Sequence, residues 1–189
     1  MGTIIDVVGS RIAGTVILLL IISSIFAGNS MNHNVRTLLN LNTAANQIAE
    51  VIDMAFLEKV GQNATSADEV IPMATSDELV IRTVNPNAIV WLKMNTKDGN
   101  HYLSITRNGK EEYNTTPYYF ESKDIFTYLD KDNNEVVPTA TNLDTIYGVK
   151  VDIVLIAPSM GKGEAPIRYP LTFWRNFKGV YLKDSIDTA

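Results

Sequence analysis

IAGTVILLLIISSIFA, residues 12–27, decides the fold, because it is a run of apolar and small residues without a single charge. As a helix it covers roughly 24 Å, slightly less than the hydrocarbon core of a bilayer at about 30 Å. Extending the helix back to Ile4 supplies the missing length and brings Asp6 and Arg11 toward the apolar region. The opening of the chain therefore predicts a membrane-inserted helix with two charges near its start.

A secretory signal peptide is the competing interpretation of this run. Signal peptides have a positively charged start, a short apolar region and a small-residue A-x-A cleavage site. Here Asp6 and one basic residue, Arg11, precede the run, and no clear A-x-A site follows it. These features favour a helix that is retained.

The residues after the run continue the helical pattern with one apolar face. GNSMNHN (28–34) is the one weak stretch, and Gly28 with Asn29 is where the helix would break or loosen. A helix that is apolar all round needs lipid or other helices around it, whereas a helix with one apolar face needs one packing partner. We therefore predict a helix over residues 1–60 whose first half projects and whose second half rests on a sheet. The face recurs at steps of three, four or seven residues, with Asn42 as the polar exception: Val35, Leu38, Ala45, Ala49, Ile52 and Phe56.

Residues 61–189 show strand patterns separated by turn residues. Lys97-Asp98-Gly99-Asn100 has the composition of a hairpin turn. Alternation such as Val149, Val151 and Ile153 marks one buried face. The pattern predicts an α+β fold in which an antiparallel sheet receives the helix and forms a β-rich extracytoplasmic head domain. The predicted strands are ELVIRTV (78–84), AIVWLKM (88–94), HYLSITR (101–107), IFTYLD (125–130), VKVDIVLIA (149–157) and YPLTFWRNF (169–177).

The composition argues against a nucleic-acid binder and against an enzyme. A net charge of -5 without a clustered basic face does not suit nucleic acid. The chain has no Cys, hence no thiolate metal site or Cys nucleophile, and its 2 His residues form no recognisable triad or metal motif. We expect no catalytic site and no cofactor.

Three segments in the second half of the chain carry a family resemblance: FTYLDKDNNEVVP (126–138), LDTIYGVKVDIVLIAP (143–158) and YPLTFWRNF (169–177). These segments resemble the C-terminal part of type IV minor pilins and secretion pseudopilins. In the first, a strand ends in aromatic-x-Asp before an Asp/Asn turn. In the second, a short linking helix precedes an I-x-x-V-x-V strand, and in the third the last strand ends near Arg-Asn. With the N-terminal helix, the resemblance covers about half of the chain.

The resemblance implies a pilin-like fold and a structural subunit of an extracytoplasmic, cell-surface helical filament. The partners would be copies of the chain or related pilin-like subunits, the membrane before assembly, and an inner-membrane assembly machinery. The family also implies a leader peptidase that cuts before the helix and N-methylates the new end, with Glu at the fifth position. This chain has Asp6 instead, which becomes fifth if Met1 is removed and Gly2 is the mature N-terminus.

Asp6 needs a partner or a place at the membrane edge, because an uncompensated carboxylate in hydrocarbon is costly. Within one helix it is five residues from Arg11, not the three or four that bring side chains together. In the pilin-like interpretation Asp6 pairs with the amine of Gly2 or with Arg11 of an adjacent helix, and the pairing fixes the axial register of assembly. Two alternatives stay open: both charges reach the headgroups, and the chain is a single-span anchored binding module that does not polymerise.

Asp130, Asp132 and Asn134 alternate as at the start of a calcium loop and are a weak candidate metal site. A calcium loop of the EF-hand type requires Gly at its sixth position and Glu at its twelfth, where this chain has Glu135 and Thr141. A solvated turn is the favoured interpretation, because Asp and Asn form local hydrogen bonds in turns.

Overall fold

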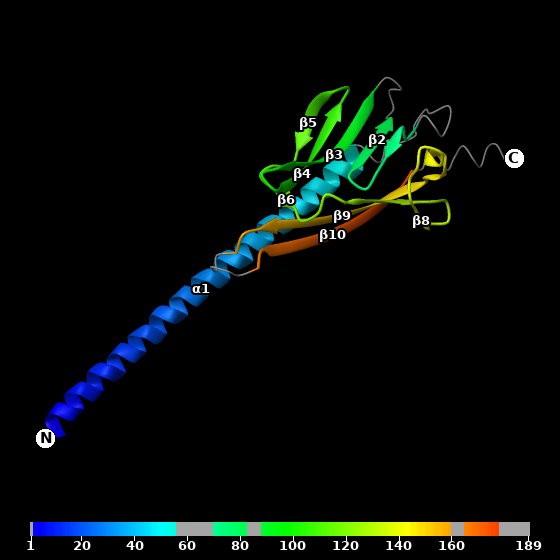
Figure 1. The fold of residues 1–189 in the computed structure, drawn as a ribbon. Coiled ribbons are helices and arrows are strands. Elements are labelled where there is room, and N and C mark those ends of the chain that lie inside the picture. Colours follow the sequence, from blue (N-terminus) through cyan, green and yellow to red (C-terminus); the bar gives the residue numbers. More distant parts are fainter. Residues whose placement is uncertain (1, 56–69, 83–87, 160–164, 178–189) are drawn as a thin grey trace.

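The described part of the chain is one long helix joined to a curled antiparallel sheet (Figure 1). The computed structural model describes residues 2–55, 70–82, 88–159 and 165–177, with the side chains of the helix described over residues 15–53. The helix, α1 (Gly2–Ala55), enters the head with its C-terminal half and projects far beyond the sheet with its N-terminal half. This arrangement is an α+β fold.

α1 runs without interruption through Gly28 and Asn29, so the predicted weak point is not a break. The first proline is Pro72, and every residue before it can donate its backbone N–H to the helix. A single glycine weakens a helix by only about 1 kcal/mol relative to alanine, which the long flanking segments tolerate. The predicted linker at 61–69, with the boundary between helix and head, lies outside the described residues.

Every strand pairing among the described residues is antiparallel, and the order is β1-β2-β3-β4-β6-β9-β7-β8. In addition, β5 pairs with β4, and β10 pairs with β9 along its whole length, from Ile167 opposite Ala157 to Asn176 opposite Gly148. A short 3-10 helix, η3 (Leu143–Thr145), leads into β9. The strands are β1 (Met73–Ala74), β2 (Glu78–Arg82), β3 (Ile89–Lys97), β4 (Asn100–Arg107), β5 (Lys110–Asn114), β6 (Tyr119–Phe120), β7 (Phe126–Leu129), β8 (Glu135–Val136), β9 (Gly148–Ala157) and β10 (Ile167–Asn176).

Two tight hairpins build the β3-β4-β5 meander. Asp98 and Gly99, with φ of 54° and 79°, connect β3 to β4, at the turn that the sequence predicted. Asn108 and Gly109, with φ of 49° and 80°, connect β4 to β5. Positive φ at both central residues matches the right-handed twist of the flanking strands.

The sheet curls because β7 is tied back to the turn before β2. The backbone oxygen of Ser76 accepts hydrogen bonds from the N–H groups of Ile125 and Phe126 at 2.9 and 3.0 Å. The buried Tyr128 hydroxyl donates to the backbone oxygens of Thr75 at 2.8 Å and Glu78 at 3.2 Å. Burial raises the pKa of this phenol far above its ordinary value, so Tyr128 stays a neutral donor.

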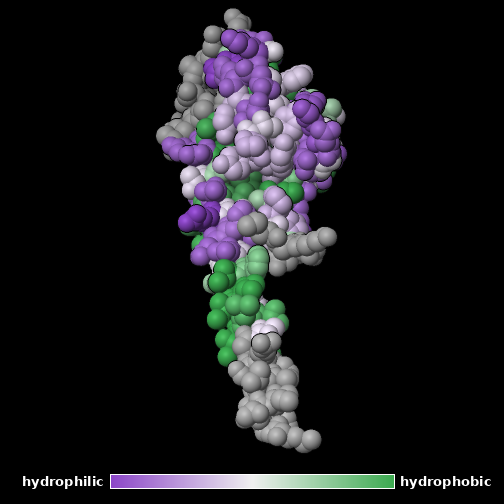
Figure 2. All heavy atoms as spheres, turned by 90° about the vertical axis from the view of Figure 1, so that its left-hand side faces the viewer, coloured by the Kyte–Doolittle hydropathy of each residue, from purple (hydrophilic) through white to green (hydrophobic). Residues whose placement is uncertain are grey.

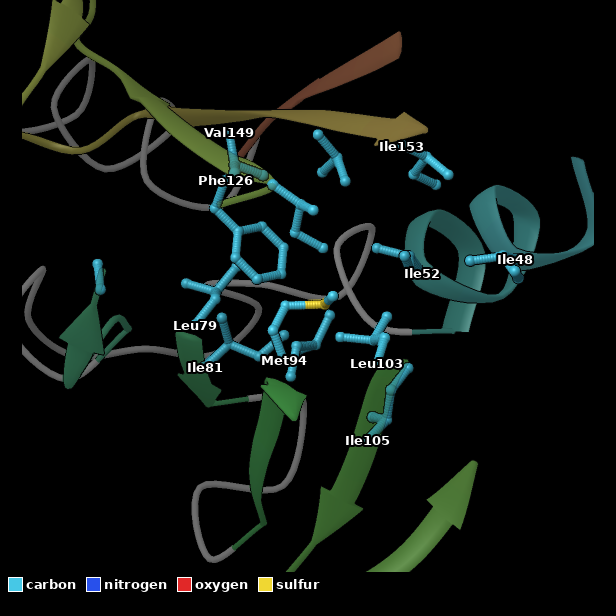
Figure 3. Close-up of a cluster of buried hydrophobic side chains, with 14 of the residues drawn as sticks. Ile48, Ile52, Leu79, Ile81, Met94, Leu103, Ile105, Phe126, Val149 and Ile153 are labelled. Carbon is cyan, nitrogen blue, oxygen red and sulfur yellow. The ribbon is translucent and has the colours of Figure 1, made fainter. Parts of the chain in front are cut away.

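One continuous core fills the curled sheet, and α1 contributes to it directly (Figure 3). Ile48 and Ile52 point from the helix toward the sheet residues. Both helix residues are buried, at 1% and 0% exposure. The head and the second half of the helix are therefore one folded unit. The sheet residues labelled in the cluster are Leu79, Ile81, Met94, Leu103, Ile105, Phe126, Val149 and Ile153.

Candidate assembly helix

Over its described side chains, from residue 15 onward, the first half of α1 is bare. From Val16 to Phe26 the large apolar side chains are exposed by 41–71%. In the view of Figure 2 the helix surface just below the largely hydrophilic head is hydrophobic. By length and composition this helix is able to cross a membrane, as an anchor or a signal would. Exposed apolar area of this extent marks a surface that lipid or protein covers.

The three predicted assembly residues, Gly2, Asp6 and Arg11, all lie in the first turns of α1. Their side chains fall outside the part of the helix whose side chains the structure describes. Their proposed pairing across subunits therefore stays a prediction.

The buried face of α1 begins at Leu41. Its core members, Leu41, Ala44, Ala45, Ile48 and Ile52, are 0–3% exposed, and Ala49 packs partly buried against them. Two residues of the predicted face, Ala45 and Ile52, belong to this set. Val35 and Leu38 do not, because they remain 48% and 42% exposed. Phe56 lies outside the described residues.

Val35 and Leu38 are only partly covered because they lie at the very end of the sheet. β10 begins at Ile167, and this residue lines a shallow groove together with Val35, Leu38, Asn34 and Met31 of the helix. The helical periodicity continues past the end of the sheet, so the sequence placed the start of the packed face too early. Here α1 leaves the head and becomes bare.

Two polar contacts with β10 fix the packed half of α1 on the sheet. The Tyr169 hydroxyl donates to Asn42 Oδ1 at 3.0 Å, which explains the polar exception in the apolar face. Near the other end, the Arg175 guanidinium donates from Nε and Nη2 to the two carboxylate oxygens of Asp53. The side chains of this ion pair are 29% and 24% exposed, and its two-point geometry restricts rotation and sliding of the helix.

Sequence reasoning missed Asp53. It is 122 residues from Arg175, and no local pattern relates the two. Arg175 was singled out only through the resemblance at the end of the last strand, whereas Asn42 did leave a signal as a polar residue in an apolar face.

Asp130 organises the turn between β7 and β8. Its carboxylate accepts hydrogen bonds from the backbone N–H groups of Asp132 and Asn134, each at 2.8 Å, and from Asn134 Nδ2 at 3.1 Å. These bonds, the backbone bond from Asn134 foremost, lower the pKa of Asp130. The oxygens of Asp130 are thus directed at the turn's own donors. Within the described ranges, no group of three or more His, Cys, Asp or Glu residues is placed to hold a metal ion.

Comparison of the chain with protein-family models, with curated proteins and with solved structures finds no match. The function is therefore argued from the residues and the geometry above.

Proposed function

We propose that the chain is a structural subunit of an extracytoplasmic helical filament, of the type IV pilus or secretion pseudopilus kind. The N-terminal helices bundle into the filament core, and the β-rich heads form the shell. The supporting observation is the division of one continuous helix into a bare apolar half and a half that is part of the head core. The resemblance of the segments around Tyr128, Val149 and Arg175 to minor pilins and pseudopilins points the same way.

The division matters because the packed half of the helix holds the bare half in a fixed orientation relative to the head. The second half is locked to the sheet by its buried face and by the Asp53–Arg175 and Asn42–Tyr169 contacts. Removing apolar side chains from water stabilises by about 25 cal/mol per Å² of buried area. Lipid and a helix bundle both keep the bare helix out of water, so its transfer from one to the other changes this free energy little. The bundle then depends on few polar contacts for its register, and Asp6 is the proposed one, through the Gly2 amine or Arg11 of a neighbouring copy.

Assembly from detergent tests this function. The purified full chain should form helical fibres, visible by electron microscopy, when detergent is removed. Asp6→Ala should abolish the fibres or disorder them. Glu50→Ala is the matched control, because it removes an exposed carboxylate from the packed half of the same helix. Persistent wild-type monomers would refute the filament role.

A single-span anchored binding module is the second candidate function. It is favoured by Trp91 and Trp174, which stand on the outer surface of the head with 45% and 68% of their area exposed. Tryptophan is enriched in the energetic centres of protein interfaces. In this case the wild-type chain stays monomeric and forms no fibres when detergent is removed. Trp174→Ala then weakens capture of a surface partner while leaving membrane insertion unchanged.

A further inference from the structure

A single arginine interrupts the long uncharged course of α1. From residue 12 to residue 49 the sequence contains no Asp, Glu or Lys, and Arg36 is its one formal charge. The Arg36 side chain is exposed and makes no ion pair within the described part of the chain. Its guanidinium is therefore available to an anion outside the chain, and guanidinium groups bind phosphate through two parallel N–H donors.

Arg36 lies one membrane thickness along the helix from Arg11. The rise of α1 between these two residues is about 38 Å, and a typical tilt of about 20° reduces it to about 35 Å across the membrane. The hydrocarbon core of a bilayer is about 30 Å thick, and the bilayer with its headgroups is about 40–45 Å thick. When the helix spans a bilayer, the two arginines therefore fall in the headgroup layers of opposite leaflets.

From this we infer that Arg36 binds lipid phosphate and seats the head directly on the headgroup layer of the membrane before assembly. The inference rests on the membrane stage of the proposed function and specifies where the head stands in that stage.

The residues on the two sides of Gly28 match the two layers of the membrane. Residues 12–27 are apolar or small and suit the hydrocarbon core. The next stretch, GNSMNHN (28–34), is rich in amide and hydroxyl side chains, which are costly in hydrocarbon and suit the headgroup layer. Arg36 follows at the depth where a cationic side chain reaches the phosphates.

The end of the sheet lies at the level of Arg36. Val35 and Leu38, on either side of Arg36 in the sequence, line one groove with Ile167 at the start of β10. Ile167 pairs with Ala157 at the end of β9, so these two strand ends form the base of the head. With Arg36 at the phosphates, the base of the head touches the membrane surface. Figure 1 shows β5 at the end of the head away from the bare half of α1.

The charge pattern favours lipid over a neighbouring copy as the partner of Arg36. Between Asp6 and Glu50 the helix contains no acidic residue, so a second helix inserted at the same depth brings no carboxylate near Arg36. Two such helices would instead place their Arg36 side chains at the same level, where like charges repel. Lipid phosphates surround the helix at that depth and supply the missing anion.

Fluorescence quenching measures how close the base of the head lies to the lipid headgroups. The chain has no Cys, so Pro158→Cys and Lys110→Cys each create a single site for a fluorescent label. Pro158 is exposed and directly follows β9 at the base of the head, whereas Lys110 is exposed and begins β5. Each labelled full-length chain is reconstituted into vesicles of phosphatidylcholine and phosphatidylglycerol in which a fraction of the lipids carries a headgroup quencher. We expect strong quenching of the label at position 158 and its loss at position 110.

The role of Arg36 is tested in the Pro158→Cys chain. A cation near an anionic membrane surface contributes enough that Arg36→Gln should lower the ratio of seated to unseated heads about fivefold, which reduces the quenching. Arg36→Lys keeps the charge and should retain most of the quenching. Lys110→Gln is the matched control, because it removes an exposed cation from β5 and should leave the quenching unchanged.

Equal quenching at positions 158 and 110, or none at position 158, would overturn the seat. Quenching at position 158 that survives Arg36→Gln, or that falls as much with Lys110→Gln, would overturn the assignment of Arg36 as the phosphate contact. Resistance of the chain to alkaline extraction from the vesicles reports membrane insertion separately. Chains that insert and form fibres but show no quenching at position 158 refute the seat and leave the filament role intact. Chains that do not insert refute the membrane stage on which both depend.

Discussion

The two halves of α1 both carry large apolar residues, in opposite surroundings. Val16 and Phe26 of the bare half are 51% and 71% exposed, whereas Leu41 and Ile52 of the packed half are 2% and 0% exposed. The helix backbone does not change between them. The difference comes entirely from the sheet, which covers one half and ends at Ile167 before it reaches the other.

The comparison teaches that secondary structure and stability are separate properties in this molecule. Most helical stability in proteins comes from tertiary packing of an apolar face. The packed half has that support from the head, and the bare half requires lipid or neighbouring helices for it. A substitution should therefore act on the head or on assembly according to the half in which it lies.

The largest expected effect is on the stability of the head, and it is tested by replacing one isoleucine in each half of α1. Ile52→Ala opens a cavity in the core shared by helix and sheet, and we expect it to lower the free energy of unfolding of the head by about 2–5 kcal/mol. Ile22→Ala removes the same atoms from a side chain that is 41% exposed, and should leave head stability unchanged. Urea unfolding in detergent, followed by tryptophan fluorescence, measures both. Equal losses would show that the bare half also packs on the head.

A smaller effect on the stability of the head is expected from replacing a glycine of the sheet, compared with a glycine of the bare half of α1. A Cβ at Gly148 would lie 2.7 Å from Asn176 Oδ1 and 3.0 Å from the backbone oxygen of Arg175, so the Asn176 side chain and the β10 backbone would have to shift. We expect Gly148→Ala to lower the free energy of unfolding by about 1–3 kcal/mol through overpacking. A Cβ at Gly28 in the bare half meets nothing within 4 Å.

Gly28→Ala is therefore the control for Gly148→Ala. It should raise the helix content seen by circular dichroism and leave head unfolding unchanged, because alanine is favoured over glycine by about 1 kcal/mol in a helix. A stable Gly148→Ala head would mean that the Asn176 side chain and the Arg175 backbone shift without cost.

These contrasts also mark what the sequence could predict. The long helix, its two kinds of surface and the strands containing Leu79, Leu92 and Ile153 follow from periodicity alone, and the structure has them. The start of the packed face at Leu41 does not follow, because periodicity describes the helix and not the length of its partner. The continuous helix was predicted with Gly28 and Asn29 as a place where it could break or loosen, and the structure has no break there.

Strand β5 and the helix-to-sheet contacts needed information that no segment contains. KEEYN (110–114) is polar and largely exposed, so it lacks the alternation of a half-buried strand. The preceding Asn108-Gly109 pair was the available signal for its hairpin. The Asp53–Arg175 pair joins residues distant in sequence, and only the register of α1 on β10 brings them together.

The smallest expected effect is a pH-dependent one confined to the head. Hydrogen bonds in the β7–β8 turn lower the pKa of Asp130 in the folded chain relative to the unfolded chain. A lowered folded-state pKa adds stability that is fully present above the unfolded pKa and is lost as pH falls through the folded one. Asp130→Ala should therefore be less stable than wild type near neutral pH, and the two should converge in acid.

Asp132→Ala is the matched control, because among the described contacts Asp132 serves the turn through its backbone N–H, which alanine keeps. Urea midpoints between neutral and acid pH measure all three chains. A difference between wild type and Asp130→Ala that does not shrink in acid would contradict the role of the ionised carboxylate. Detergent-free fibre formation should be the same for all three, since Asp130 lies in the β7–β8 turn of the head and the bare half of α1 contains none of its partners.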